Sequence, residues 1–167
     1  MTMTAKQIDA VVTADGLAIN GYVIDEKLPL EHYQEILGIP SRTIAAGPPA
    51  PAGHRNNQVH VFDAEGIYLT EHHASRLIES VNFIFDPTES AFPIESAFCG
   101  NLKIDRNQLL SNMSEAHLDA ALFDRDLPGE YSIKYKKCWV GVSAKGRRDS
   151  NGKRRSPRYV VRVSVCF

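Results

Sequence analysis

Short alternating apolar stretches separated by turn dipeptides are the feature that most limits how this chain can fold. Residues 8–24 read IDAVVTADGLAINGYVI, in which Asp15-Gly16 and Asn20-Gly21 separate apolar runs. Asp-Gly and Asn-Gly pairs between strand-forming runs favour tight hairpin turns. This part of the sequence therefore predicts short strands joined by tight turns.

A second hairpin is predicted at residues 59–72, VHVFDAEGIYLTEH, with its turn at 63–66. Residues 75–86, SRLIESVNFIFD, predict a further strand because apolar and polar residues alternate along them. The apolar residues that we place on one alternation of the hairpin are Val59, Val61, Ile67 and Leu69.

Two helices are expected. The segment 28–38, LPLEHYQEILG, has apolar residues at helical spacing, namely Leu30, Tyr33, Ile36 and Leu37. Gly38 suits the end of this helix, and Pro40 prevents its resumption. Ser114 is a suitable N-cap for a second helix. The apolar face of that helix would consist of Leu118, Ala121 and Leu122.

The order of elements recurs at an offset of 85 residues, so that the segment after Gly100 resembles the segment after Gly16. We interpret the chain as one globular unit, 1–167, made of two β-β-α-β-β-β repeats at about 8–86 and 98–167. In the second repeat, residues 131–146 are interpreted as one long strand, with a final strand at the C-terminus. The expected fold is α+β, with antiparallel strands in one or two sheets and two helices packed on one face.

Composition and charge narrow the class of protein. The chain is 43% hydrophobic and 23% charged, and its net charge of −1 predicts no general attraction to nucleic acid or anionic membranes. No apolar run approaches the roughly 18 residues of a membrane span, and the N-terminus lacks the pattern of a signal peptide. We therefore expect a cytoplasmic protein, and we expect its three cysteines, Cys99, Cys138 and Cys166, to be reduced and buried.

No arrangement of residues in the sequence points to catalysis. The GxSxG, P-loop, GxGxxG and HExxH motifs are absent. Adjacent His72 and His73 would lie on opposite sides of a strand, which is unsuited to a shared metal ion. Cys138 follows three lysines, but the strand alternation places it among buried valines rather than at an electropositive surface. We predict a non-enzymatic protein with no catalytic residue, no metal and no cofactor.

Residues 144–158, AKGRRDSNGKRRSPR, form the clearest charge anomaly. Seven Lys and Arg residues stand beside one acid, a local charge of +6 in a chain of net charge −1. Ser150-Asn151-Gly152 supplies a turn, so we expect the tip of a long hairpin. Three interpretations stay open: a solvated loop, a docking site for an acidic protein, and a phosphate or nucleic-acid site. The segment has no aromatic residue, which disfavours nucleic acid.

The order of a helix, an LGxPxR turn, a hairpin with the pattern VHVFDxxGI and a strand resembles a known group of proteins. The residues that carry the resemblance are Leu37, Gly38, Pro40, Arg42, Val61, Asp63, Gly66 and Ile67. Over residues 8–110 the pattern is similar to bacterial immunity-type domains encoded beside Rhs and type VI secretion polymorphic toxins. It is more distantly similar to BamE and β-lactamase-inhibitor-protein repeats. The second half departs from this pattern, because no LGxP follows Leu122.

The resemblance implies a cytoplasmic immunity protein that binds a cognate secreted toxin and neutralises it by covering its active site. The residues that we expect to contact the toxin are Tyr131, Tyr135, Trp139, Arg147, Arg148, Arg154 and Arg155. The alternative is a small nucleic-acid or phosphate-ligand binding protein that uses the basic hairpin at 145–158. Steep salt dependence of binding, without a protein partner, would favour this alternative.

Overall fold

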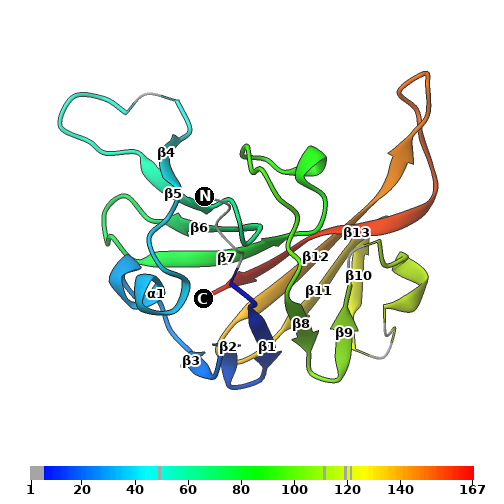
Figure 1. The fold of residues 1–167 in the computed structure, drawn as a ribbon, viewed down its shortest axis with the longest axis horizontal. Coiled ribbons are helices and arrows are strands. Elements are labelled where there is room, and N and C mark those ends of the chain that lie inside the picture. Colours follow the sequence, from blue (N-terminus) through cyan, green and yellow to red (C-terminus); the bar gives the residue numbers. More distant parts are fainter. Residues whose placement is uncertain (1–5, 49, 111, 119, 121) are drawn as a thin grey trace.

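Strands dominate the computed structural model, which describes residues 6–48, 50–110, 112–118, 120 and 122–167 (Figure 1). Strands make up 49% of the structure and helical residues 9%, with one α-helix and two sheets. The expected α+β fold with two helices packed on one face is therefore wrong, and the fold is mostly β.

The smaller sheet has five strands in the order β3-β2-β1-β8-β9. Its members are β1 (Asp9–Thr13), β2 (Gly16–Ile19), β3 (Tyr22–Ile24), β8 (Asn101–Ile104) and β9 (Asn107–Leu109). The predicted turn at Asn20-Gly21 joins β2 to β3, and both residues have positive φ, 49° and 86°. Strands β1 and β8 pair in parallel, so the expectation of purely antiparallel strands is wrong for this pair.

The larger sheet has eight strands in the order β10-β11-β12-β13-β7-β6-β5-β4. Its members are β4 (Arg42–Ala46), β5 (Asn57–Phe62), β6 (Ile67–Glu71), β7 (Ile78–Ile84), β10 (Asp124–Leu127), β11 (Glu130–Lys134), β12 (Trp139–Arg148) and β13 (Arg154–Cys166). Strands β4–β7 and β10–β13 each form a meander, and antiparallel pairing of β7 with β13 joins the two meanders. The division into repeats at about 8–86 and 98–167 stays a prediction.

Residues 131–146 do not form the single long strand that was expected. They form β11 and β12, which pair as an antiparallel hairpin. The backbone N–H of Tyr135 donates a hydrogen bond of 2.9 Å to the carbonyl oxygen of Cys138 and closes the turn between the two strands. Two exposed lysines occupy this turn, and the apolar alternation changes register across them. That register change marks a reversal of the chain rather than a continuous strand.

The predicted hairpin of β5 and β6 is present, but its apolar residues face both ways. Val59 and Val61 pack with Tyr68, whereas Ile67 and Leu69 belong to the main core. Placing the four valine, isoleucine and leucine residues on one alternation was therefore wrong. Both faces of this part of the sheet are covered, so apolar side chains occupy both.

Helix α1 (Leu30–Leu37) confirms the first predicted helix. Tyr33, Ile36 and Leu37 are buried on its apolar face. The helix ends at Gly38, which has φ 92°, and its N–H donates to the carbonyl oxygen of Gln34. A positive φ costs glycine little, so this residue ends the helix without strain.

The second predicted helix is reduced to a 3-10 turn, η2 (Glu115–His117). The Ser114 hydroxyl accepts a hydrogen bond from the backbone of Ala116, as expected of a cap, but Leu118 already has extended backbone, with φ −70° and ψ 132°. Only nine residues separate Ser114 from β10, and so short a segment gains little from helix formation after the cost of nucleation. Leu118 is buried, Leu122 packs partly against the core, and Ala121 lies outside the described residues.

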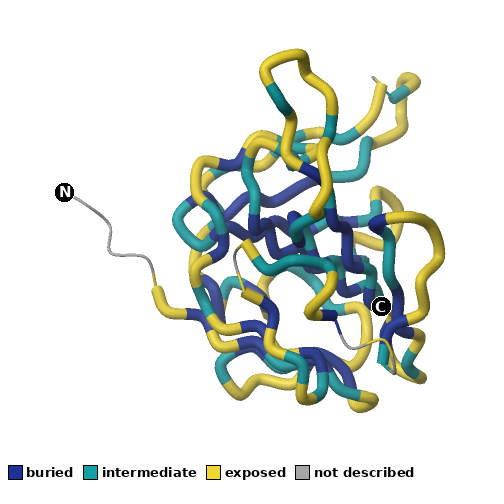
Figure 2. The backbone as a smooth tube through the Cα atoms, turned by 90° about the vertical axis from the view of Figure 1, so that its right-hand side faces the viewer, coloured by how far each residue is buried: buried dark blue, intermediate teal, exposed yellow. Residues whose placement is uncertain are grey.

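The main hydrophobic core is formed by residues of both sheets and of α1. Figure 2 shows the buried segments, in dark blue, in the interior of the molecule. A smaller cluster on the opposite face of β5–β7 is covered by the segment after η1 (Pro87–Glu89), which contributes Phe92 and Ile94. Among the cysteines, Cys138 is buried as expected and Cys166 is partly buried, but Cys99 is exposed. Within the described residues, no helix has the length and apolar character needed to cross a membrane.

Candidate functional site

Strands β12 and β13 form a hairpin that projects from the end of the larger sheet (Figure 1). The sequence predicted this hairpin, and the turn is organised by Asp149. Its Oδ1 accepts hydrogen bonds of 2.9 Å from the backbone N–H groups of Asn151 and Lys153, and its Oδ2 accepts one of 2.8 Å from Arg155 Nε. The hydrogen bond from Arg155 and those from the backbone lower the pKa of the Asp149 carboxyl.

The base of the hairpin is held by Glu89, at the end of η1. The two carboxylate oxygens of Glu89 accept hydrogen bonds of 2.9 and 2.8 Å from the guanidinium of Arg154, and Lys145 Nζ lies 3.2 Å from the same carboxylate. The pKa of Glu89 is lowered, first by the hydrogen bond from Arg154. Glu115 holds Arg158 in a similar way, at 3.1 Å. Acids distant in sequence thus neutralise three of the seven basic residues.

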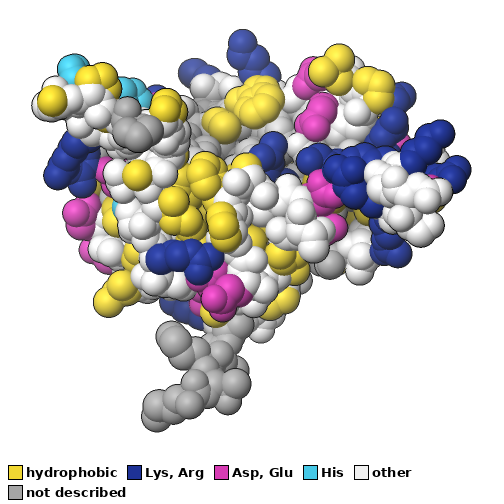
Figure 3. Space-filling model, turned by 90° about the horizontal axis from the view of Figure 1, so that it is seen from above, with side chains coloured by type: hydrophobic (Ala, Val, Ile, Leu, Met, Phe, Trp, Pro, Cys, Tyr) yellow, Lys and Arg dark blue, Asp and Glu magenta, His cyan; other side chains and the backbone are white. Residues whose placement is uncertain are grey.

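Three cations of the hairpin have no carboxylate partner among the residues that the structure describes: Arg147, Arg148 and Lys153. Arg147 stacks on the ring of Tyr159, 4.6 Å from its centroid, and donates to Asn112 at 3.2 Å. Lys and Arg side chains gather at this end of the molecule (Figure 3). The hairpin therefore presents a local excess of positive charge on a rigid support.

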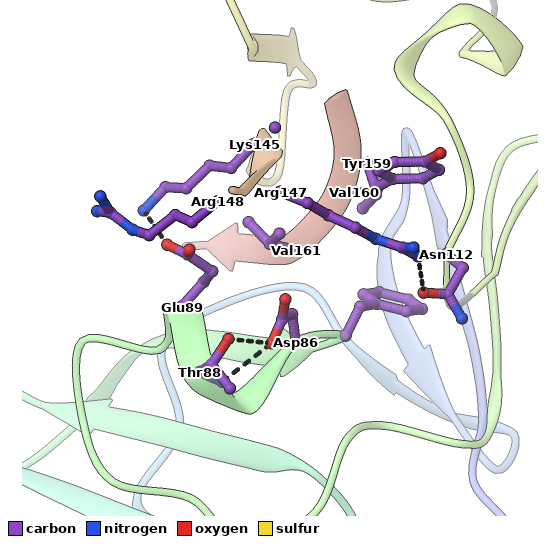
Figure 4. Close-up of a pocket in the computed structure, with 12 residues that line it drawn as sticks. Asp86, Thr88, Glu89, Asn112, Lys145, Arg147, Arg148, Tyr159, Val160 and Val161 are labelled. Carbon is purple, nitrogen blue, oxygen red and sulfur yellow. Dashed lines mark hydrogen bonds and ion pairs between the residues drawn. The ribbon is translucent and has the colours of Figure 1, made fainter. Parts of the chain in front are cut away.

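A cleft of about 370 Å³ lies at the foot of the hairpin. In Figure 4 the side chain of Arg147 reaches across it to Asn112, and Glu89 meets Lys145 at the other side. Asp86, beside η1, adds a second acid to the lining. Three bases, Lys145, Arg147 and Arg148, line the cleft together with these two acids, so the cleft shares the positive charge of the hairpin.

The seven expected contact residues do not form one surface. Tyr131 donates a hydrogen bond of 2.6 Å to Glu115, Tyr135 donates one to Asp105, and both rings pack partly against the main core. Burial, and then these carboxylates, raise the pKa of both phenols. The two tyrosines therefore serve contacts within the chain rather than a flat exposed surface.

Trp139 is 43% exposed and lies at the opposite end of β12 from the hairpin tip, about 30 Å away for a strand of this length. Its ring covers Gly141, where an added Cβ would come within 2.7 Å of the indole. Arg147, Arg148, Arg154 and Arg155 do lie together on the hairpin, but two of them are already paired with acids.

The structure contains a separate polar cluster that the sequence analysis did not predict. Thr43, His60 and Glu71 come from β4, β5 and β6, and they meet on one face of the sheet. Nothing in the local sequence marks them, because strand register alone brings them together.

About two thirds of the chain match a known family. The family model described as Domain of unknown function (DUF7738) matches residues 10–119. The chain belongs to this family. The match spans the smaller sheet, the β4–β7 meander and Glu89. It ends before the β12–β13 hairpin. No curated protein and no solved structure matches the chain.

Proposed function

We propose that this DUF7738 protein is a cytoplasmic, non-enzymatic immunity protein that binds a cognate toxin and covers the toxin's active site. The observation that supports this most is the projecting β12–β13 hairpin, which carries Arg147, Arg148 and Lys153 without carboxylate partners among the described residues. A hairpin two strands wide is narrow enough to enter an enzyme cleft. In this proposal the hairpin is the blocking element.

The rigidity of the hairpin supports tight binding. Glu89 fixes its base and Asp149 organises its turn, so little conformational freedom is left to lose on binding. Gly146 allows the strands to approach closely, because a Cβ there would overlap the carbonyl oxygen of Arg155. An inhibitor that must act at low concentration needs a dissociation constant near the nanomolar range, about −12 kcal/mol. Preorganisation of the contact residues favours such values.

The charge of the hairpin indicates the kind of surface that it would meet. Arginine is among the residues that most often dominate binding energy, and its guanidinium pairs with carboxylates in two parallel hydrogen bonds. Cations at the tip would also accelerate encounter with an acidic surface. The toxin's active-site cleft is therefore expected to be acidic, and Trp139 is expected to lie outside this contact.

The experiment is co-expression with the protein encoded by the adjacent reading frame. We expect that protein to stop growth of the host and the parent chain to restore it. The triple variant Arg147→Glu, Arg148→Glu, Lys153→Glu should lose both rescue and co-purification. The matched control reverses three exposed cations elsewhere: Lys103→Glu, Arg106→Glu and Lys136→Glu.

Two results would count against the proposal. Absence of rescue by the parent chain would remove the immunity function. Equal rescue by the hairpin variant and its control would remove the hairpin from the interface. Binding of a DNA or RNA oligonucleotide with a steep salt dependence, lost in the hairpin variant, would favour the nucleic-acid or phosphate-ligand alternative.

A further inference from the structure

The polar cluster formed by Thr43, His60 and Glu71 forms the floor of a cleft of about 260 Å³ at the far edge of the larger sheet. His60 and Glu71 are buried, with side chains 6% and 3% exposed, whereas Thr43 is exposed. They lie on the same sheet face as Phe62 and Leu69, which belong to the main core. The cluster therefore begins where apolar packing between the sheets ends.

Both oxygens of the buried Glu71 carboxylate have hydrogen-bond partners. Glu71 Oε2 lies 2.9 Å from His60 Nε2, and Glu71 Oε1 accepts a hydrogen bond of 2.5 Å from Arg76 Nε. A carboxylate only accepts, so His60 Nε2 is the donor, and its Nδ1 lies 2.9 Å from the Thr43 hydroxyl. The charge of Glu71 is thus paired with that of Arg76, and Arg55 is left as the cleft's cation without a carboxylate partner among the described residues.

The walls of the cleft carry hydrogen-bond donors that the described residues leave unused. Arg55, at the end of the loop before β5, lines the cleft and is exposed. Arg76 uses Nε for Glu71, and its two terminal nitrogens have no partner among the described residues. His73 lines the same cleft, and its Nδ1 lies 3.0 Å from Asn57 Oδ1, whereas its Nε2 has no partner among the described residues. Positive charge therefore exceeds negative charge here.

A tight turn positions Arg76 beside the cleft. Arg76 has φ 60°, the left-handed region that favours glycine. The backbone N–H of Arg76 donates a hydrogen bond of 3.0 Å to the carbonyl oxygen of His72, so this conformation closes the turn between β6 and β7. A glycine would relieve the backbone at this turn but would remove the guanidinium from Glu71 and from the cleft.

We propose that this cleft binds a phosphoryl group, either as free phosphate or as a phosphate monoester, between Arg55, Arg76 and His73. A dianion with several acceptor oxygens suits two guanidinium groups and an imidazole that approach from different segments. The volume admits a phosphoryl group with a small substituent but is below the range usual for larger ligands. The site lies within residues 10–119 and is separate from the β12–β13 hairpin.

The test is isothermal titration calorimetry of the full chain at low ionic strength with three probes: inorganic phosphate, phenyl phosphate and acetate. We expect both phosphates to bind more tightly than acetate. Tighter binding of phenyl phosphate would identify a monoester site, and tighter binding of inorganic phosphate would identify a free-phosphate site. No binding, or binding of acetate as tight as that of phosphate, would overturn the proposal.

Variants locate the binding. Arg55→Gln changes an exposed residue with no hydrogen bond to the rest of the described chain, so it should fold normally and weaken phosphate binding at least about tenfold. Arg106→Gln is the matched control at a distant exposed arginine and should change nothing. Equal binding by Arg55→Gln and the parent would overturn the assignment. So would loss of binding in Arg147→Gln, Arg148→Gln, because that result would place the phosphate on the hairpin.

Discussion

Tyr33 offers a test of how the core of this fold is built. Its side chain lies on the buried face of α1 and is 0% exposed, and its hydroxyl has no hydrogen-bond partner among the described residues. A buried hydroxyl without a partner costs about 1–3 kcal/mol. Tyr33→Phe removes this cost and loses only the small packing contribution of one oxygen atom. We expect the variant to be more stable than the parent by about 1–2 kcal/mol.

The assay is urea unfolding followed by circular dichroism, together with a thermal scan. For a chain of this size the gain corresponds to a rise in Tm of roughly 2–8 °C. Tyr22→Phe is the control, because the Tyr22 side chain is 60% exposed and its hydroxyl meets water in both states. The control should change stability by less than about 0.5 kcal/mol.

Alkaline pH gives a second measurement of the same effect. Burial raises the pKa of Tyr33 above its usual value of 10. Above pH 10 the unfolded chain loses this proton while the folded chain keeps it, so the parent loses stability as pH rises. Relative to Tyr33→Phe, the loss should be about 1.4 kcal/mol per pH unit, and below pH 10 the difference should be constant. A variant less stable than the parent, or a difference that does not change above pH 10, would refute the reasoning.

Three further predictions concern the hairpin and the thiols. Glu89→Gln should lower Tm more than Glu95→Gln, whose parent carboxylate is 76% exposed. Because the pKa of Glu89 is lowered in the folded chain, this difference in Tm should be full above the ordinary glutamate pKa of about 4.3 and should shrink as pH falls below it. At pH 8 a thiol reagent should modify Cys99 first and Cys138 last, since burial raises the pKa of Cys138 to about 11, and equal rates would contradict this. Gly146→Ala should speed hydrogen exchange of the hairpin amides, and unchanged exchange would show that its close approach is unimportant.

Local signals in the sequence were sufficient wherever a turn or a cap decided the structure. Asn20, Gly21 and Gly38 have positive φ, a conformation that most other residues adopt only at an energetic cost. The turn and the end of the helix were therefore predictable. The second helix failed because its segment is too short to repay nucleation, although Ser114 caps the 3-10 turn that replaces it. An apolar spacing alone does not distinguish a helix from a turn followed by a strand.

The candidate hairpin was predictable from charge, but its internal pairing was not. The composition of residues 144–158 predicts an exposed basic turn. Glu89 and Glu115, however, lie far from this segment in the sequence, and only the fold brings them into contact with its arginines. The Thr43–His60–Glu71 cluster is harder still. Its members belong to three strands, and the β4–β5 and β5–β6 registers that bring them together depend on packing across the whole sheet.

The two proposed sites lie far apart on the larger sheet, so substitutions at one site should not affect the other. The strand order places β12 and β13 four or more strands from β4, and Figure 1 shows the hairpin and the loop after β4 on opposite sides of the molecule. Distant sites without shared partners respond additively to substitution. Hairpin variants should therefore leave phosphate binding unchanged, and Arg55→Gln should leave toxin neutralisation unchanged. A phosphate-saturated protein that neutralises the toxin less well would show instead that the sheet couples its two ends.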